Sequence, residues 1–148
     1  MNLTLTPVGR VLNDHTQKPE TGWNDIISEL IIKEKYRKAL SGIEEFSHIT
    51  VLFWLDQTAA GESLTVNPMG KKHLPQVGVF ATHSPSRPNP IGITVCRLLS
   101  REGCLLKVRG LDAYNDTPIL DIKSYTSISA PQSFAHPDWI DEIVSEEK

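Results

Sequence analysis

Hydrophobic residues along this chain occur in short runs or alternate with polar ones, and polar segments with Pro and Gly separate them. Alternation is typical of half-buried strands, and short apolar runs are typical of buried ones. Strands are expected over Leu3–Leu12, Ile26–Ile32, Ile49–Leu55, Val77–Thr82, Ile93–Leu99 and Cys104–Leu111. The run I-T-V-L-F-W-L at Ile49–Leu55 is nearly all apolar, which predicts a strand buried on both faces.

Helical patterning is scarce. One or two turns are expected at Tyr36–Leu40, and His136–Trp139 opens a short C-terminal helix. Ser100–Gly103 predicts a hairpin turn, and Asp56–Gln76 reads as a long loop. Six or seven short strands with little helix indicate a mainly β fold, a barrel or a sandwich, in one domain over residues 1–148.

Composition narrows the function classes. The chain has 148 residues and a net charge of −3, which argues against a protein that coats nucleic acid through a general basic excess. A local basic patch remains open, and its candidate residues are Lys71, Lys72, His73, Arg87, Arg97, Arg101, Lys107, Arg109 and Lys123. No apolar run approaches the ~20 residues of a membrane helix, so no membrane partner is expected.

Common catalytic and cofactor motifs are missing from the sequence. It has no G-x-G-x-x-G, P-loop, H-E-x-x-H, C-x-x-C or G-x-S-x-G pattern. The five histidines are scattered, so no metal is expected. Cys96 and Cys104 read as two reduced thiols, which favours the cytoplasm.

A proline-rich loop lies within Gly78–Ile93, G-V-F-A-T-H-S-P-S-R-P-N-P-I-G-I. Proline fixes φ and restricts the preceding residue, so three prolines within six residues make a stiff loop. Such a loop is either an elaborate turn or a ligand clamp around Arg87.

Polar residues also crowd Leu111–Tyr125, L-D-A-Y-N-D-T-P-I-L-D-I-K-S-Y. Asn-Asp-Thr-Pro is a turn sequence in which side chains can bond the backbone. From composition alone, an ordinary turn followed by an edge strand is preferred over a site for this segment.

Three segments in order resemble the TsaA/TrmO family, the β-barrel S-adenosylmethionine-dependent tRNA methyltransferases. Phe46–Leu55 resembles the family's F-S-H strand, Val77–Ile93 its R-P-N-P-I-G signature, and Gly110–Tyr125 its D-G-T-P-V-L-D-I-K-P-Y run. The resemblance implies a small barrel that works as a homodimer and binds S-adenosylmethionine. It also implies methyl transfer to the exocyclic nitrogen of threonylcarbamoyl-adenosine beside a tRNA anticodon. No C-terminal domain in addition to the barrel, such as longer members carry, is expected.

The resemblance also assigns site residues by position. Cofactor contacts are expected at His83, Ile93, Asn115, Asp116, Thr117, Pro118, Asp56 and Gln57. Arg87 and Asn89 are expected to line the same region, and Trp23 to stack on a base. A base must accept the N–H proton, and Asp121 and Tyr125 are the alternatives, with Lys123 beside them.

Three positions depart from the family pattern. His83 stands where many members have arginine, Asn115-Asp116 replaces Asp-Gly, and Ser124 replaces proline. Other readings stay open: methylation of another RNA or a small metabolite, a non-catalytic module that binds S-adenosylmethionine or RNA, and a purely structural barrel.

Overall fold

The computed structural model describes residues 1–58 and 62–147. The chain divides into two compact units. The barrel unit comprises Met1–Gln57 and Ile91–Thr126, and the second unit comprises Thr58–Pro90 and Ser127–Lys148.

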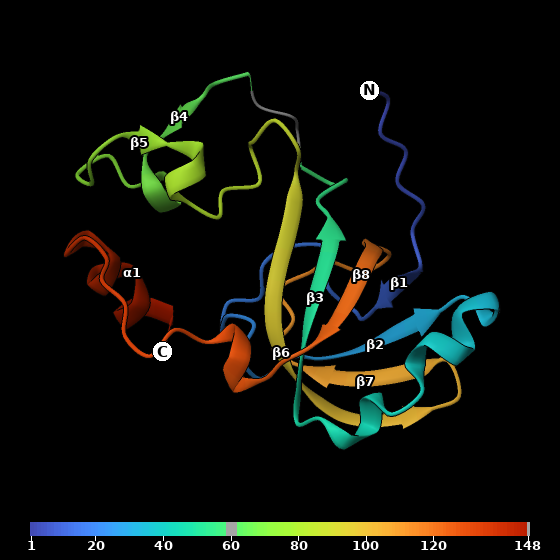
Figure 1. Ribbon diagram of the computed structural model, residues 1–148. Helices are drawn as coiled ribbons and strands as arrows, with labels where there is room; N and C mark the ends of the chain where they lie inside the picture. The colour runs from blue at the N-terminus through green and yellow to red at the C-terminus, as the bar shows by residue number, and fades with distance from the viewer. Residues whose placement is uncertain (59–61, 148) are drawn as a thin grey trace. The chain divides into compact units, whose positions relative to one another are not determined.

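Six antiparallel strands among the described residues close into a barrel in the order β1–β2–β7–β6–β3–β8 (Figure 1). They are β1 (Gly9–Leu12), β2 (Ile27–Ile32), β3 (His48–Trp54), β6 (Ile91–Glu102), β7 (Leu105–Arg109) and β8 (Pro118–Ser124). Pairing of Gly9 with Ile119 joins the first strand to the last and removes the free sheet edges. The expected small, mainly β barrel is confirmed.

Alternation along β3 sets the wall of the barrel. Ile49, Val51 and Phe53 point inward and are at most 2% exposed. Leu52 and Trp54, which alternate with them, are half-buried. The expectation of a strand buried on both faces is therefore wrong, because the outer face of this barrel wall keeps its apolar side chains partly in solvent.

Strand β6 is longer than expected and bends. It begins two residues early and continues into the hairpin with β7, where Gly103 takes a left-handed φ of 60°. The register shifts between Leu98 and Ser100, a bulge that increases the local twist. Near its start, Gly92 faces Phe53 so closely that an added Cβ would lie 2.3 Å from the ring.

Two other strands begin or end differently from the expectation. The first strand starts at Gly9 because Pro7 cannot donate a ladder hydrogen bond. The strand expected at Val77–Thr82 is only β5 (Val77–Gly78), and a 3₁₀ turn, η4 (Val79–Ala81), follows it.

The helix expected at Tyr36–Leu40 is confirmed as a 3₁₀ helix, η1 (Glu34–Leu40), in the barrel unit. A second 3₁₀ turn, η2 (Ile43–Glu45), follows Gly42, whose φ of 84° is left-handed.

The second unit contains short elements and one α-helix. They are β4 (Thr65–Val66), η3 (Pro68–Gly70), β5, η4, η5 (Ser127–Ser129) and α1 (Trp139–Glu147). Lys71 Nζ contacts Glu142 Oε1 at 3.1 Å and also contacts Glu146, and His73 Nε2 lies 2.8 Å from Glu142 Oε1. These contacts tie α1 to the segment that was expected to be only a loop.

Within residues 1–58 and 62–147, no helix is long and apolar enough to cross a membrane. The same ranges contain no group of three or more His, Cys, Asp or Glu side chains arranged to hold a metal ion.

Candidate functional site

The turn Asn115–Pro118 lies where β1, β3 and β8 meet at one end of the barrel. Its backbone bonds to the loop and strand before it: Asn115 N–H donates to the His15 carbonyl at 2.8 Å, and Asp116 N–H donates to the Val11 carbonyl at 2.8 Å. Thr117, at 3% exposed, is one of the buried polar residues. The turn is thereby held rigidly, which suits a surface that contacts a ligand.

Asp116 carries a positive φ of 65°. This is the position where the family pattern has glycine, so the chain keeps the left-handed conformation without the residue that adopts it most easily. Aspartate tolerates this region better than most residues. Arg10 Nη1 donates to Asp116 Oδ1 at 2.7 Å and holds the carboxylate in place.

Asn115 joins three segments that are distant in sequence. Its Oδ1 accepts from Asn13 N–H at 3.0 Å, across 102 positions, and its carbonyl accepts from Gln57 Nε2 at 2.8 Å, across 58 positions. The prediction that Gln57 and Asn115 belong to one site is consistent with this contact. Asp56 precedes Gln57 in the short segment that follows β3.

Three rings form an aromatic cluster beside this turn. Trp23 lies 5.8 Å from His15 in an edge-on arrangement and 5.8 Å from Tyr114 in a tilted one, measured between ring centroids. Tyr114 directly precedes Asn115. Trp23, predicted as a stacking residue, therefore lies near the polar turn, which offers a ligand both an aromatic surface and polar atoms.

The predicted catalytic residues lie along the outer face of β8. Lys123 Nζ pairs with Asp121 Oδ2 at 3.0 Å, and Asp121 Oδ1 accepts the Ile122 N–H at 2.9 Å. Tyr125 follows the strand, is 37% exposed, and has its ring 6.5 Å from that of His48.

The turn and Tyr125 lie at opposite ends of β8. The strand spans Pro118–Ser124, so these ends are about 20 Å apart at ~3.3 Å per residue. Asn115 and Tyr125 therefore lie too far apart on one chain to contact the same ligand atom.

The proline-rich loop belongs to the second unit and folds back on itself. Arg87 Nη1 donates to the carbonyls of Thr82 at 2.9 Å and Ser84 at 3.2 Å. His83 and Asn89 are exposed. The sequence predicts either an elaborate turn or a ligand clamp here. In the structure, Arg87 holds the backbone of the loop in its turn conformation. Ile93, expected at the loop's exit, is 51% exposed on β6 in the barrel unit.

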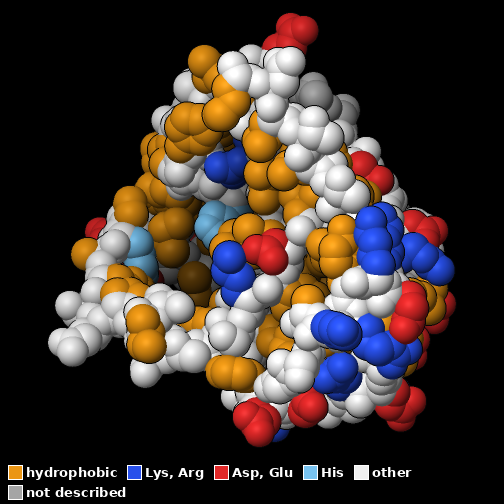
Figure 2. Space-filling view, turned by 45° about the vertical axis from the view of Figure 1, so that its right-hand side comes forward, with side chains coloured by type: hydrophobic (Ala, Val, Ile, Leu, Met, Phe, Trp, Pro, Cys, Tyr) orange, Lys and Arg blue, Asp and Glu red, His pale blue; other side chains and the backbone are white. Residues whose placement is uncertain are grey.

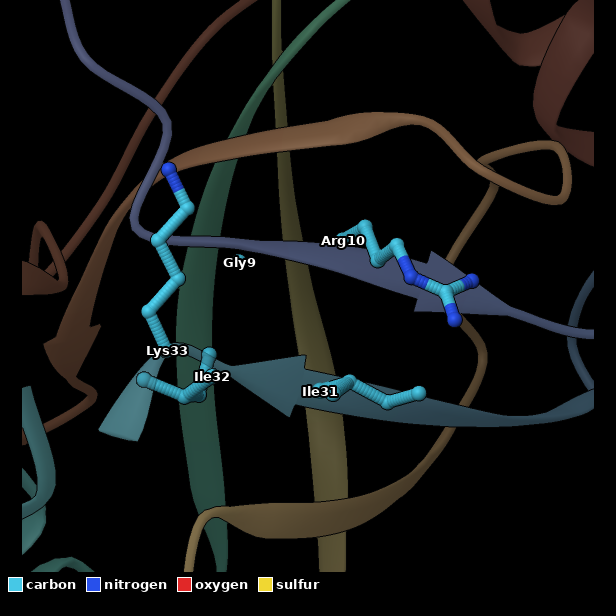
Figure 3. Close-up of a pocket in the computed structure, with 5 residues that line it drawn as sticks. All are labelled: Gly9, Arg10, Ile31, Ile32 and Lys33. Atoms are coloured by element: carbon cyan, nitrogen blue, oxygen red, sulfur yellow. The ribbon is translucent and has the colours of Figure 1, made fainter.

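A shallow cavity of about 230 Å³ lies beside β1 and β2, and none of the predicted site residues lines it (Figure 3). Gly9, Arg10, Ile31, Ile32 and Lys33 line it. The side chains of Arg10 and Lys33 extend away from one another in Figure 3, so they do not converge on one ligand atom.

Neither thiol is poised as a nucleophile. Cys96 and Cys104 are free, as predicted. Burial, with a smaller contribution from Asp112, raises the pKa of the Cys96 thiol to about 12. Burial and a hydrogen bond to Glu34 raise the pKa of Cys104 above its usual value.

Sequence reasoning missed Arg10, Asn13 and His15. Each comes from the first strand or the loop after it, and only closure of the barrel brings them to Asn115. A lone arginine and a polar loop carry no sequence signal for this role.

The fold and this cluster define a class: a small antiparallel β-barrel protein whose polar turn and aromatic rings gather where β1, β3 and β8 meet. Residues 13–129 match the family model described as the tRNA-methyltransferase O N-terminal domain, and the chain belongs to this family.

Relatives of known name agree with the family. The chain is 41% identical to an "S-adenosyl-L-methionine-binding protein" of Archaeoglobus fulgidus over 84% of its length and 90% of that protein. It is 35% identical to the human "tRNA (adenine(37)-N6)-methyltransferase" over 67% of its length. It spans only 23% of that human protein and 32% of a second Archaeoglobus relative.

Solved structures give the same family. A crystal structure of TrmO superposes with a TM-score of 0.75 at 28% identity, covering 94% of this chain and 64% of that one. A crystal structure of TrmO from Pseudomonas aeruginosa superposes with a TM-score of 0.73 at 27% identity, covering 93% of this chain and 62% of that one.

Proposed function

We propose that this protein is an S-adenosylmethionine-dependent methyltransferase that modifies the exocyclic nitrogen of threonylcarbamoyl-adenosine beside a tRNA anticodon. Family membership and the names of the relatives support the cofactor and the tRNA substrate. The observation that carries the proposal here is the convergence of Gln57, Trp23 and Asn115 at one end of the barrel. We place the activity in the cytoplasm, where two free thiols stay reduced.

The residues at this turn fit the cofactor's chemistry. S-adenosylmethionine, when bound, supplies a methyl group already activated on a sulfonium. The oxygens of Asp116 and Asn115 suit its hydroxyl and ammonium groups, and the rings of Trp23 and Tyr114 suit its adenine. Thr117, Pro118, Asp56 and Gln57 complete the proposed contacts in the barrel unit, with Ile93 on β6. His83, in the second unit, stays a prediction from the sequence.

The protein must also position the acceptor and accept a proton. Formation of the N–CH3 bond releases the proton of the exocyclic nitrogen, so a base within hydrogen-bond reach accelerates the reaction. Asp121 and Tyr125 are the proposed alternatives for this base. Lys123 Nζ, 3.0 Å from Asp121 Oδ2, holds that carboxylate in position. Arg87 and Asn89, in the second unit, stay predictions from the sequence.

Two observations support a homodimer. The proposed cofactor turn and Tyr125 lie about 20 Å apart on one chain, so a second copy is needed to bring the two kinds of residue together. Ile91, Ile93 and Val95 form an exposed apolar row on β6, at 38%, 51% and 46% exposure, and such rows mark protein contacts.

Calorimetry with S-adenosylmethionine tests the cofactor, and mass spectrometry of tRNA nucleosides after incubation tests the reaction. We expect Asn115→Ala and Gln57→Ala to weaken cofactor binding, with Lys38→Ala, on η1, as a matched surface control. Asp121→Asn and Tyr125→Phe should leave cofactor affinity intact, and the true base is the one whose loss slows methylation. No cofactor binding at millimolar concentration would refute the proposal.

A second candidate is a non-catalytic module that binds S-adenosylmethionine. The relative that the chain spans almost fully is named only for that binding. Cofactor affinity without any methylated tRNA nucleoside would favour this reading. Methylation of a different RNA or of a small metabolite would point to the same chemistry on another acceptor.

A further inference from the structure

Four side chains form one row across the outer face of the barrel. In the register, Arg109 on β7 pairs with Arg97 on β6, and Arg97 pairs with His48 on β3. Tyr125, just after β8, donates its backbone N–H to the His48 carbonyl at 3.2 Å. We call Arg109, Arg97, His48 and Tyr125 the arginine row.

The two arginines point outward. Arg97 and Arg109 are exposed, while Cys96, Leu98 and Val108 beside them in the strands are at most 9% exposed and face the core. Alternation along each strand therefore directs both guanidinium groups to the same outer face. Like charges directly opposite one another in a sheet are destabilising.

On the face drawn in Figure 2, Lys and Arg side chains gather with Asp and Glu side chains among them. Arg10, Arg37 and Arg101 each pair with a carboxylate. Among the described residues, Arg97 and Arg109 have no carboxylate within 4.0 Å. The row is thus a concentration of positive charge in a chain whose net charge is −3.

The nearest acids in the register belong to other rows. Glu29 on β2 lies opposite Lys107, and Asp121 pairs with Lys123. The position opposite Arg109 on β2 is Ile27. The adjacent guanidinium groups of Arg97 and Arg109 therefore offer a place for an anion from outside the chain.

We propose that the arginine row binds the phosphate backbone of RNA. A guanidinium group matches phosphate oxygens with two parallel N–H donors, so Arg97 and Arg109 can hold one phosphate between them. His48 Nδ1 is bonded to Ser47 Oγ at 2.8 Å, which directs Nε2 away from that contact. The Tyr125 ring, 37% exposed, ends the row with a surface on which a base can stack.

The position of the arginine row on the barrel also suits the proposed RNA substrate. It crosses four neighbouring strands, about 14 Å at ~4.8 Å per strand, and ends at Tyr125. It lies at the end of β8 away from the Asn115 turn. This inference rests on the proposed function for its choice of RNA over an acidic protein.

Binding of labelled tRNA and of an oligouridylate by the full chain tests the proposal. The variant is Arg97→Ala with Arg109→Ala. The control is Lys33→Ala with Lys38→Ala, which removes the same charge from exposed residues beyond the far end of β2. We expect the arginine variant to bind both RNAs about tenfold more weakly or worse, and its salt slope to fall by about one to two. The control should change affinity less than twofold.

Arg109→Glu separates binding from folding. It places a carboxylate opposite Arg97, so thermal stability should hold or rise while RNA affinity falls further than in the alanine variant. A purely structural role for the two arginines predicts that this substitution leaves RNA affinity unchanged.

Each outcome decides between the two proposals. Normal cofactor binding and methylation, with RNA affinity unchanged in the arginine variant, overturns the row and leaves the proposed function standing. RNA binding that depends on the row, without methylation, supports the row and overturns the proposed reaction. A wild-type protein that binds neither RNA overturns both. Row-dependent binding of polyglutamate, with no RNA binding, assigns the row to an acidic protein and overturns the proposal.

Discussion

Asp116 allows the sharpest test of how the candidate turn is held. It is a non-glycine residue with a φ of 65°, and its carboxylate pairs with Arg10 at 2.7 Å. Replacing it with Gly, Asn and Ala separates the backbone conformation from the ion pair. Glycine removes the cost of the left-handed conformation. Asparagine keeps the tolerance of aspartate for that conformation but loses the negative charge that pairs with Arg10. Alanine loses both the tolerance and the charge.

The magnitudes can be worked from these two features. A left-handed conformation costs an ordinary L-residue about 1–2 kcal/mol. An ion pair whose side chains are 50% and 65% exposed contributes about 0.2–1 kcal/mol. Asp116→Gly relieves the cost of the left-handed conformation but removes the ion pair. It also adds about 0.5–1 kcal/mol of backbone entropy cost, so the net change in unfolding free energy is close to zero. Asp116→Ala keeps the left-handed cost and should lose about 0.2–1 kcal/mol of unfolding free energy with the ion pair, and a further part because alanine tolerates this conformation less well than aspartate.

Thermal and urea unfolding measure these differences. For a chain of this size 1 kcal/mol corresponds to about 2–4 °C in Tm. We expect the order wild type and Gly, then Asn, then Ala, and added salt should narrow the gap between wild type and Asn. An alanine variant as stable as wild type, or a glycine variant as unstable as alanine, would refute the reasoning.

The other predictions concern the core, a thiol and helix α1. Gly92→Ala should destabilise the barrel by about 1–3 kcal/mol in urea unfolding, because the added Cβ meets the aromatic ring opposite it. Cys96 should resist alkylation at pH 8 until the protein unfolds, and its stabilising effect, present below pH 9, is lost as the pH rises toward 12. Hydrogen bonds from His73 and, to a smaller extent, Lys71 lower the pKa of Glu142. The contacts that anchor α1 should therefore be complete above pH 4.5 and be lost as the pH falls through the lowered pKa of the folded protein, as NMR shifts of α1 should show.

Each of these has a matched control. Gly78→Ala should be tolerated, because its Cβ would meet nothing closer than 3.9 Å. Cys104, half-buried, should react before Cys96. Glu142→Gln should remove the acid-dependent change of α1, and an unchanged pH profile in that variant would contradict the assignment.

The sequence by itself determined much of the fold and the location of the candidate residues. Short apolar runs predicted the strands because their period reflects burial of one or both faces of a sheet. The hairpin at Ser100–Gly103 followed from local backbone chemistry, and Gly103 does carry the left-handed φ. The segment Asn115–Pro118 was predicted as a turn because Asn, Asp and Pro favour turns locally.

Only the tertiary structure decided which of these residues meet. Pairing of β1 with β8 closes the barrel and carries Asn13 to Asn115 across 102 positions. Asn115 and Tyr125 lie at opposite ends of β8 because the segment between them is an extended strand. The pairing of Arg97 with Arg109 depends on the register of β6 against β7, in a hairpin that carries a bulge. Register and closure are set by cooperative packing of the whole barrel, which no local pattern of residues encodes.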